Sequence, residues 1–458
     1  MSQETNSAPV TENKMGTMPI GRLVFNMSLP MMISMLVQAL YNIVDSIFVA
    51  KLSENALTAV SLAFPLQTLI IAVATGTGVG VNALLSKSLG AHKYDEANKI
   101  GINGAVLYAF SYVIFLILGL TIVKPFYMSQ IGNADVEIMD MGVSYLSTVM
   151  IFSFGIFAEI FFERVLTSTG RTIFSMTSQL CGAITNIILD PIMIFGLLGF
   201  PKLGATGAAV ATVVGQCVAA VVAFVCNHKF NHDIKLSFKG YSPDFKIMGT
   251  IYAIGIPSII MQSIGSVMMF GMNKILISFT EAATAVFGAY FKLQSFIFMP
   301  CFGLNNAMVP IVSYNYGAQK FDRVRKTVRL TVFTAIGIMC VGCALFECIP
   351  ETLLGMFSPT GEMLSIGRVA LRIIGVHFPL AGFSIIAGSA CQALGKPIYA
   401  LINSVCRQIV VLLPAAYLLS LTGRLELVWL AFPIAEVVSV ILNATFLRLT
   451  YRASLERK

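Results

Sequence analysis

Long apolar runs recur along the whole chain and are separated by short polar segments. Each run has about the twenty residues that a helix needs to cross a hydrocarbon core of ~30 Å. The runs are continuously apolar rather than alternating, which favours spanning helices over the strands of a membrane barrel. The pattern therefore predicts an all-α polytopic membrane protein. Its twelve predicted spans cover residues 28–50, 57–86, 99–123, 138–162, 172–198, 204–226, 247–278, 284–313, 328–348, 364–390, 397–420 and 428–450.

Composition excludes a soluble protein. Of the 458 residues, 57% are hydrophobic and 11% are charged, whereas soluble domains have about 25% charged residues. The nine cysteines lie almost entirely within predicted spans, which indicates small buried residues. The sequence has no GxxxxGK[ST] loop, no metal-ligand cluster and no catalytic triad, and its four histidines are scattered. We therefore expect neither an enzyme nor a cofactor. Without a site for ATP, any transport by this chain would be driven by an ion gradient.

Basic residues predict the orientation in the membrane. With both termini in the cytoplasm, twenty Lys and Arg residues lie on the cytoplasmic side and six lie on the other side. This asymmetry is typical of inner-membrane proteins, because positively charged loops stay on the cytoplasmic side. The net charge of +8 is thus an orientation signature that faces anionic lipid, and nucleic acid is not an expected partner. We expect a multi-pass cell-membrane protein that acts as a monomer.

The two halves of the chain repeat each other. An offset of 227 residues sets "GAHKYDEANK" at 90–99 against "GAQKFDRVRK" at 317–326, and the same offset matches Gly76 with Gly303. Each half then holds six spans. The predicted divisions are a cytoplasmic tail at 1–22, an N-lobe at 23–226, a cytoplasmic linker at 227–246 and a C-lobe at 247–458.

An even number of spans in each repeat implies that both halves enter the membrane in the same direction. Two such bundles face each other across an axis along the membrane normal and enclose a cavity near the midplane. Rocking one bundle against the other would expose that cavity to the two sides in turn. This is the architecture of a transporter.

Five acidic residues within or next to the predicted spans stand out, because an ionisable group in a membrane costs about 2.5–3.5 kcal/mol or more. They are therefore the first candidates for function. The five residues are Asp45, Glu159, Glu163, Asp190 and Glu436.

Asp45 and Asp190 are predicted to lie at the same level. Each is roughly 25 Å along a helix that starts at the cytoplasmic side. Tyr41 and Asn186 each precede one of these acids by one helical turn and share its face. Thr212, on the returning sixth span, reaches a similar level. These side chains could together bind a proton or a sodium ion, since two close carboxylates do not both stay ionised at low cost.

Pro191 follows Asp190 and predicts that the helix bends or opens there, because proline cannot donate to the carbonyl of Ile187. The freed carbonyl would be a further oxygen ligand. The alternative is that Asp190 only caps the freed turn, and Asp45 could likewise be a local hydrogen-bonding residue.

The other buried charges allow both functional and structural interpretations. Glu163, like Glu159, could form an ion pair with Arg164 or Arg171, and a structural pair of Glu436 with Arg407 is the favoured interpretation. Lys274 and Lys292 could line the cavity or reach the interface. The candidate substrate-cavity residues are Gln38, Gln67, Lys292 and Gln294.

Several motifs together resemble the multidrug and toxic compound extrusion (MATE) transporters over about residues 20–450. The N-lobe motifs are "YNIVDSIFVAKL" in the first span, "PLQ" in the second, "LGA" after the second, "NIILDP" in the fifth and "GATGAAVAT" in the sixth. The C-lobe motif is "AFPIAE" in the twelfth span. The resemblance implies two lobes around a V-shaped cavity and cation-coupled export of amphipathic, often cationic compounds. It also implies that Asp45, Asp190, Tyr41, Asn186 and Thr212 handle the ion, and that Glu163 joins them.

The sequence differs from one branch of this family in its C-lobe. The NorM-like branch relies on acidic residues of the C-lobe, but Met272 stands at the position matching Asp45, and spans seven and ten contain no acid. The resemblance therefore favours the DinF- or MepA-like branch. A lipid-linked saccharide flippase of the same superfamily is the alternative, and it would be expected to have a more cationic cavity.

Overall fold

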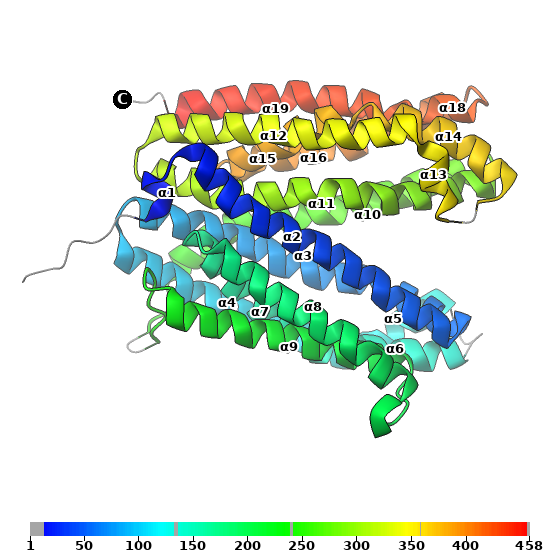
Figure 1. The fold of residues 1–458 in the computed structure, drawn as a ribbon, viewed down its shortest axis with the longest axis horizontal. Helices are drawn as coiled ribbons and strands as arrows, with labels where there is room; N and C mark the ends of the chain where they lie inside the picture. Colours follow the sequence, from blue (N-terminus) through cyan, green and yellow to red (C-terminus); the bar gives the residue numbers. More distant parts are fainter. Residues whose placement is uncertain (1–12, 132–135, 239–240, 358, 456–458) are drawn as a thin grey trace, which may run out of the picture.

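The computed structural model describes residues 13–131, 136–238, 241–357 and 359–455, and within these ranges it contains helices and no strands. Ten helices are long and apolar enough to cross a membrane, and two further bent pairs bring the number to twelve. The predicted all-α polytopic fold class is therefore confirmed. Figure 1 shows the helices arranged in two bundles that lie side by side.

The N-lobe contains the helices between residues 20 and 230. They are α2 (Ile20–Leu52), α3 (Glu54–Gly90), α4 (Tyr94–Thr121), α5 (Val123–Ile131), α6 (Val136–Ile151), α7 (Phe154–Ser168), α8 (Thr172–Phe195) and α9 (Ala205–Phe230), with a 3-10 turn η1 (Leu197–Gly199). Helix α9 ends at Phe230 and the next helix begins at Phe245, so both helices extend into the linker predicted at 227–246.

The C-lobe contains the helices from residue 245 onward. They are α10 (Phe245–Leu276), α11 (Glu281–Gly317), α12 (Phe321–Cys348), α13 (Pro350–Gly355), α14 (Gly361–Gly375), α15 (Phe378–Ala393), α16 (Pro397–Val405), η2 (Cys406–Leu412), α17 (Leu413–Ser420), α18 (Leu425–Val428) and α19 (Ala431–Leu455). The segment η2 is a π-helix, and it joins α16 and α17 into one span.

Two predicted spans are bent. The span predicted at 138–162 consists of α6 and α7, which meet at an angle of 42°, and the span predicted at 364–390 consists of α14 and α15, which meet at 47°. These two breaks occupy the fourth span of each half. The bend is therefore a feature of the repeat.

The duplication is visible in the backbone. Helices α3 and α11 each have 37 residues, and α4 and α12 each have 28. His92 and Gln319, which are 227 residues apart, both adopt positive φ in the turns that follow α3 and α11. Such a conformation is uncommon outside glycine. The same chain path has thus been kept in both halves, including its strained turn.

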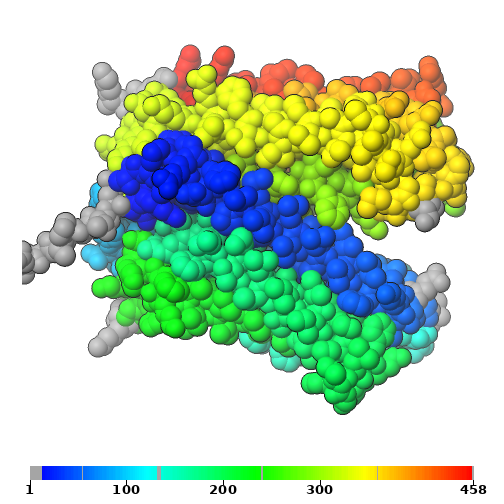
Figure 2. Space-filling view, in the orientation of Figure 1, coloured from blue at the N-terminus to red at the C-terminus, as the bar shows by residue number. Residues whose placement is uncertain are grey.

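The lobes pack closely at the end of the molecule that carries α1 (Lys14–Thr17), which we call the terminal end, and they separate at the opposite end (Figure 2). A Cβ atom on Gly90 of α3 would meet the carbonyl oxygen of Tyr314, and one on Gly317 of α11 would meet the carbonyl oxygen of Lys87. Only glycine allows backbones to approach this closely. The repeated glycines therefore close the terminal end, while the other end forms a V-shaped cleft.

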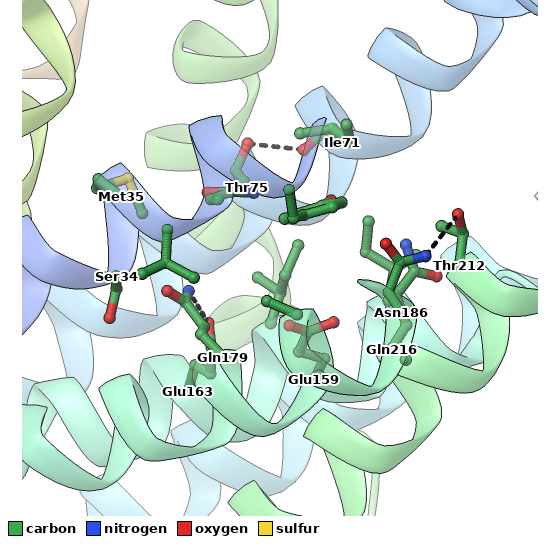
Figure 3. A pocket seen from close by; sticks show the side chains of 18 of the residues that line it. Ser34, Met35, Ile71, Thr75, Glu159, Glu163, Gln179, Asn186, Thr212 and Gln216 are labelled. Carbon is green, nitrogen blue, oxygen red and sulfur yellow. Dashed lines mark hydrogen bonds between the residues drawn. The ribbon is translucent and has the colours of Figure 1, made fainter. Parts of the chain in front are cut away.

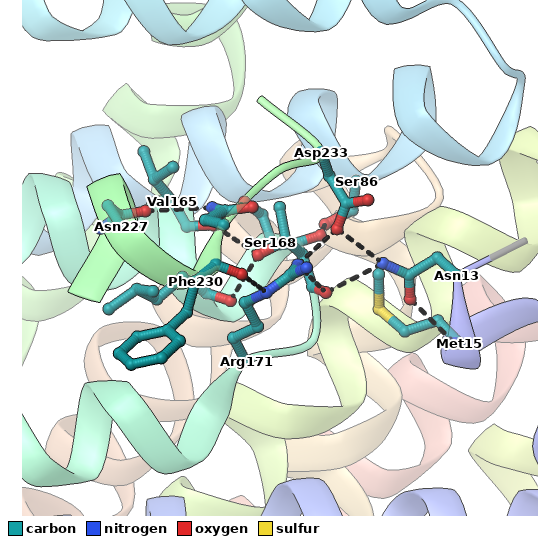
Figure 4. A network of polar contacts seen from close by, with 12 residues as sticks. Asn13, Met15, Ser86, Val165, Ser168, Arg171, Asn227, Phe230 and Asp233 are labelled. Carbon is teal, nitrogen blue, oxygen red and sulfur yellow. Dashed lines mark hydrogen bonds and ion pairs between the residues drawn. The ribbon is translucent and has the colours of Figure 1, made fainter. Parts of the chain in front are cut away.

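The short helix α1 (Lys14–Thr17) lies across the closed end. The carbonyl of Met15 accepts hydrogen bonds from Asn315 Nδ2 at 2.9 Å and Arg323 Nη2 at 3.0 Å, both in the C-lobe. On the N-lobe side, Asn13 Nδ2 donates to the carbonyl of Thr169 at 3.0 Å (Figure 4). Residues 13–18, which we call the strap, therefore connect the two lobes, whereas residues 1–12 of the tail predicted at 1–22 lie outside the described ranges.

Candidate functional site

Asp45 and Asp190 lie together in the N-lobe. Asp45 projects from α2 and Asp190 from α8, and their carboxyl groups are within hydrogen-bonding reach of each other. Asp190 is fully buried. Neither acid forms an ion pair with a described Lys or Arg. Two carboxylates this close repel each other in a low dielectric, so the pair requires a proton or a cation between its oxygens.

Asn186 connects Asp190 to α9. Its Nδ2 atom lies 3.5 Å from Asp190 Oδ1 and 3.4 Å from Thr212 Oγ1. Asn186 is buried, and its Oδ1 atom has no hydrogen-bond partner among the described residues. Asp45 Oδ1 and Asp190 Oδ2 are also buried without a partner there. Buried polar atoms are normally satisfied, so these three oxygens form a set of acceptors suited to a proton or a small cation.

The opening of the helix predicted at Pro191 is not present. Helix α8 continues through Pro191 to Phe195 and ends at Gly196, which has a positive φ of 74°. Packing of α8 against α2 and α9 supports the helical path, although proline cannot donate to Ile187. Asp190 is thus held on a continuous helix.

A pocket with several polar side chains lies beside the two aspartates. It has a volume of about 120 Å³ and is lined by Tyr41, Glu159, Glu163, Asn186 and Thr212. Figure 3 shows Glu159 pointing into this space between Glu163 on one side and Asn186 on the other. Four of the six residues named for ion coupling therefore line one cavity, and Asp45 and Asp190 lie behind this lining.

Within the pocket the two glutamates have different surroundings. Glu163 is buried and accepts hydrogen bonds from Ser178 Oγ at 3.1 Å and Gln179 Nε2 at 2.8 Å. Glu159 is half-buried and has neither a hydrogen bond nor an ion pair with a described residue. The predicted alternative of a pair with Arg171 is wrong, because Arg171 pairs with Asp233 instead. Glu159 is thus the carboxylate in the pocket that is available to a ligand.

The four candidate substrate-cavity residues do not lie together. Gln38 lines the N-lobe pocket, whereas Gln294 lines a second pocket in the C-lobe. Gln67 donates from Nε2 to the hydroxyl of Tyr145 at 2.9 Å. Lys292 is exposed, with its Nζ atom 5.9 Å from the ring centroid of Phe357.

Sequence reasoning missed several polar residues that complete the N-lobe site. Gln179 holds Glu163, and Tyr145 links Gln67 to the neighbourhood of Asp45. Ser34 lines the pocket with a buried, unpartnered hydroxyl. Uncharged polar residues are common within these spans, so their identity alone carries no signal, and only the fold selects those that meet.

The C-lobe lacks this arrangement. Met272, which matches Asp45 in the repeat, is fully buried. The predicted pair of Arg407 and Glu436 does form, with Nη1 of the arginine 3.2 Å from Oε2 of the glutamate. The C-lobe therefore neutralises its buried acid internally, whereas the N-lobe does not.

Comparison with known proteins places the chain among transporters. The profile of the MatE family matches residues 30–192 and 257–418. The multidrug export protein MepA of Staphylococcus haemolyticus is 27% identical over 430 residues, which cover 92% of each chain. The FAD transporter of Shewanella oneidensis is 26% identical over 436 residues, again 92% of each.

Solved structures agree with this result. An outward-facing conformation of a multidrug resistance MATE family transporter of the MOP superfamily superposes with a TM-score of 0.92 and 25% identity, covering 98% of this chain and 100% of that one. Two repeated six-span lobes around a cleft define a membrane transporter rather than an enzyme. The chain belongs to the MatE family.

Proposed function

We propose that this protein is a secondary active antiporter that exports amphipathic, often cationic small molecules in exchange for H⁺ or Na⁺. The observation that carries the proposal is the contact of Asp45 with Asp190 beside the N-lobe pocket, without a described basic partner. Entry of an ion between the two carboxyl groups would remove their repulsion. Loss of that ion would restore the repulsion and so favour a different arrangement of α2 and α8.

The substrate class follows from the pocket and the relatives. Glu159 offers a carboxylate to the pocket, and an organic cation would satisfy it. The relatives named MepA are multidrug export proteins, which supports export of several compounds by this chain. We further propose that the protein acts as a monomer in the cell membrane and needs no cofactor. The basic terminal end, with the strap, would face the cytoplasm.

A lipid-linked saccharide flippase remains the second candidate. Such a protein would bind a diphosphate and would need basic side chains in its cavity. The N-lobe pocket contains two glutamates and Arg164, and Lys274 and Lys292 are exposed outside both pockets. The acidic pocket favours the cation exporter.

The test uses purified protein in proteoliposomes that carry a fluorescent cationic dye. Imposing an H⁺ gradient and a Na⁺ gradient in separate experiments identifies the ion that drives dye movement. Asp190→Asn is expected to abolish gradient-driven transport while the protein stays folded, because an amide cannot release a proton or neutralise Na⁺. Transport by Asp190→Asn at the wild-type rate with either gradient would refute the assignment.

A further inference from the structure

The C-lobe has a pocket of its own on the wall of the cleft. It has a volume of about 270 Å³ and is formed by residues of α10, α11, η2 and α19, with His377 from the break between α14 and α15. Phe64 of α3 also borders it, so the pocket lies where the two lobes face each other. None of the ion-coupling residues of the N-lobe lines it.

The π-helix η2 presents the polar side of this pocket. Arg407 and Gln408 both belong to η2 and line the space. Pro414 follows in α17 and has no N–H group to donate, which removes one α-helical hydrogen bond at this point. A π-helical turn changes the direction in which its side chains project, and such turns are frequent at functional sites.

The accessible charge in the pocket is positive. Glu436 pairs with Arg407, but the glutamate side chain is 2% exposed and does not line the pocket. The arginine side chain is 33% exposed and does line it. A guanidinium group has five N–H donors, and the bond to Glu436 is its one hydrogen bond to a described residue. Glu436 therefore orients the guanidinium group and leaves donors free for a ligand.

Aromatic rings form another part of the wall. Tyr290, Phe291 and Phe432 line the pocket together with the imidazole of His377, which stacks on Phe432 with ring centroids 6.1 Å apart. Gln294 adds a buried Oε1 atom that has no hydrogen-bond partner among the described residues. Ring faces and edges of this kind bind a flat aromatic group, while Arg407 can bind a planar anion.

We propose that this pocket is a ligand subsite for an aromatic group that carries a carboxylate, with Arg407 as the carboxylate-binding residue. It deepens the proposed export function, on which its role in transport rests, by assigning to Arg407 the recognition of a carboxylate on an aromatic substrate. The amine of such a compound would meet Glu159 on the N-lobe side, and its carboxylate would meet Arg407 on the C-lobe side. Substrates with the opposite charges at their two ends then bind across the cleft.

The experiment compares two dyes that differ in one group: a rhodamine with a free carboxylate and the same rhodamine as its methyl ester. Binding to purified protein is measured by fluorescence polarisation without any ion gradient. Failure of the antiport proposal would therefore not affect this measurement. The wild-type protein is expected to bind both dyes.

The main variant is Arg407→Gln combined with Glu436→Gln, which removes both charges and leaves no unpaired buried acid. We expect its affinity for the free acid to fall about tenfold, the loss expected for a charge-assisted hydrogen bond, and its affinity for the ester to change less than about twofold. Arg407→Lys keeps the charge without the bidentate geometry and should give an intermediate loss.

Glu159→Gln is the matched control in the other lobe. It should weaken the ester at least as much as the acid, because it removes the proposed partner of the amine that both dyes share. Equal loss of both dyes in the Arg407 and Glu436 double variant would mean that the pocket has only a packing role. Unchanged binding of the acid in that variant would also overturn the proposal. Melting temperature of each variant separates loss of binding from loss of folding.

Discussion

Asp45 and Met272 stand at equivalent positions of the two repeats, yet one is an acid beside a second acid and the other is a fully buried apolar side chain. The lobes keep the same helix lengths, the same strained turns and the same close glycine contacts. They differ in their charges: the N-lobe leaves carboxyl groups without basic partners, and the C-lobe pairs Glu436 with Arg407. The two repeats thus share the features that determine helix packing, and they differ in their buried charged residues.

The largest expected effect comes from moving the acid between lobes. Asp45→Met should reduce gradient-driven dye transport in proteoliposomes to background. Adding Met272→Asp should not restore it, because the C-lobe has no counterpart of Asp190 next to that position. Met272→Asp alone should also lower the melting temperature, since it buries an unpaired charge. Recovery of transport in the double variant would show that either lobe can hold the coupling site.

The glycine contacts predict an equal effect in both lobes. Gly90→Ala and Gly317→Ala each place a methyl group against a backbone carbonyl of the other lobe, at a cost of about 1–3 kcal/mol. We expect both variants to open the terminal end to a similar degree, measured as a longer distance between spin labels on α4 and α12. Gly288→Ala is the control, because its added methyl group meets nothing within 4 Å. If only one of the two variants increased this distance, the two glycine contacts would not be equivalent.

The buried charges predict unequal effects on stability. Arg407→Met leaves Glu436 buried without a partner and should lower the free energy of unfolding by about 3 kcal/mol. Glu163→Gln exchanges one hydrogen-bonding group for another beside Gln179 and should cost about 1 kcal/mol. Thermal unfolding in detergent compares the two variants. A larger loss for Glu163→Gln would contradict the distinction between an ion pair and a hydrogen-bonded acid.

The smallest expected effect concerns the strap, which binds both lobes. Arg323→Ala removes the bonds to the carbonyls of Met15 and Met18, at 3.0 and 2.7 Å. We expect amide hydrogen exchange in residues 14–18 to become several times faster, because the strap opens more often. Arg325→Ala is the control, since among the described residues the guanidinium of Arg325 pairs with Asp322 alone, at 4.0 Å. Equal exchange in the two variants would exclude a role for Arg323 in holding the strap.

Much of the fold could be predicted from the sequence because its signals are local or periodic. Apolar runs of spanning length gave the number of spans, and the 227-residue offset gave the two halves. The bends within the fourth span of each half were not predicted, because apolar length does not reveal where a helix breaks. The docked strap was also missed, since polar residues near a terminus resemble a loose tail until the lobes that bind them are known.

The candidate site also has features that the sequence predicted and features that it did not. Counting residues along helices predicted that Asp45, Asp190 and Thr212 share a level and that Asn186 shares the face of Asp190, because 1.5 Å per residue is a fixed property of a helix. Counting could not reveal that Gln179 rather than a basic residue holds Glu163, since this depends on how α7 packs against α8. It also could not separate Gln38 from Gln294, which lie in different lobes.

The sequence by itself determined that this is a duplicated twelve-span membrane protein with rare acids in apolar helices, because hydrophobicity, repetition and helical rise are properties of the chain. Only the tertiary structure decided which acids remain without a basic partner and which wall of the cleft presents Arg407. Partnership depends on contacts between helices that are far apart in the sequence, and a charge acquires its chemical role from those contacts.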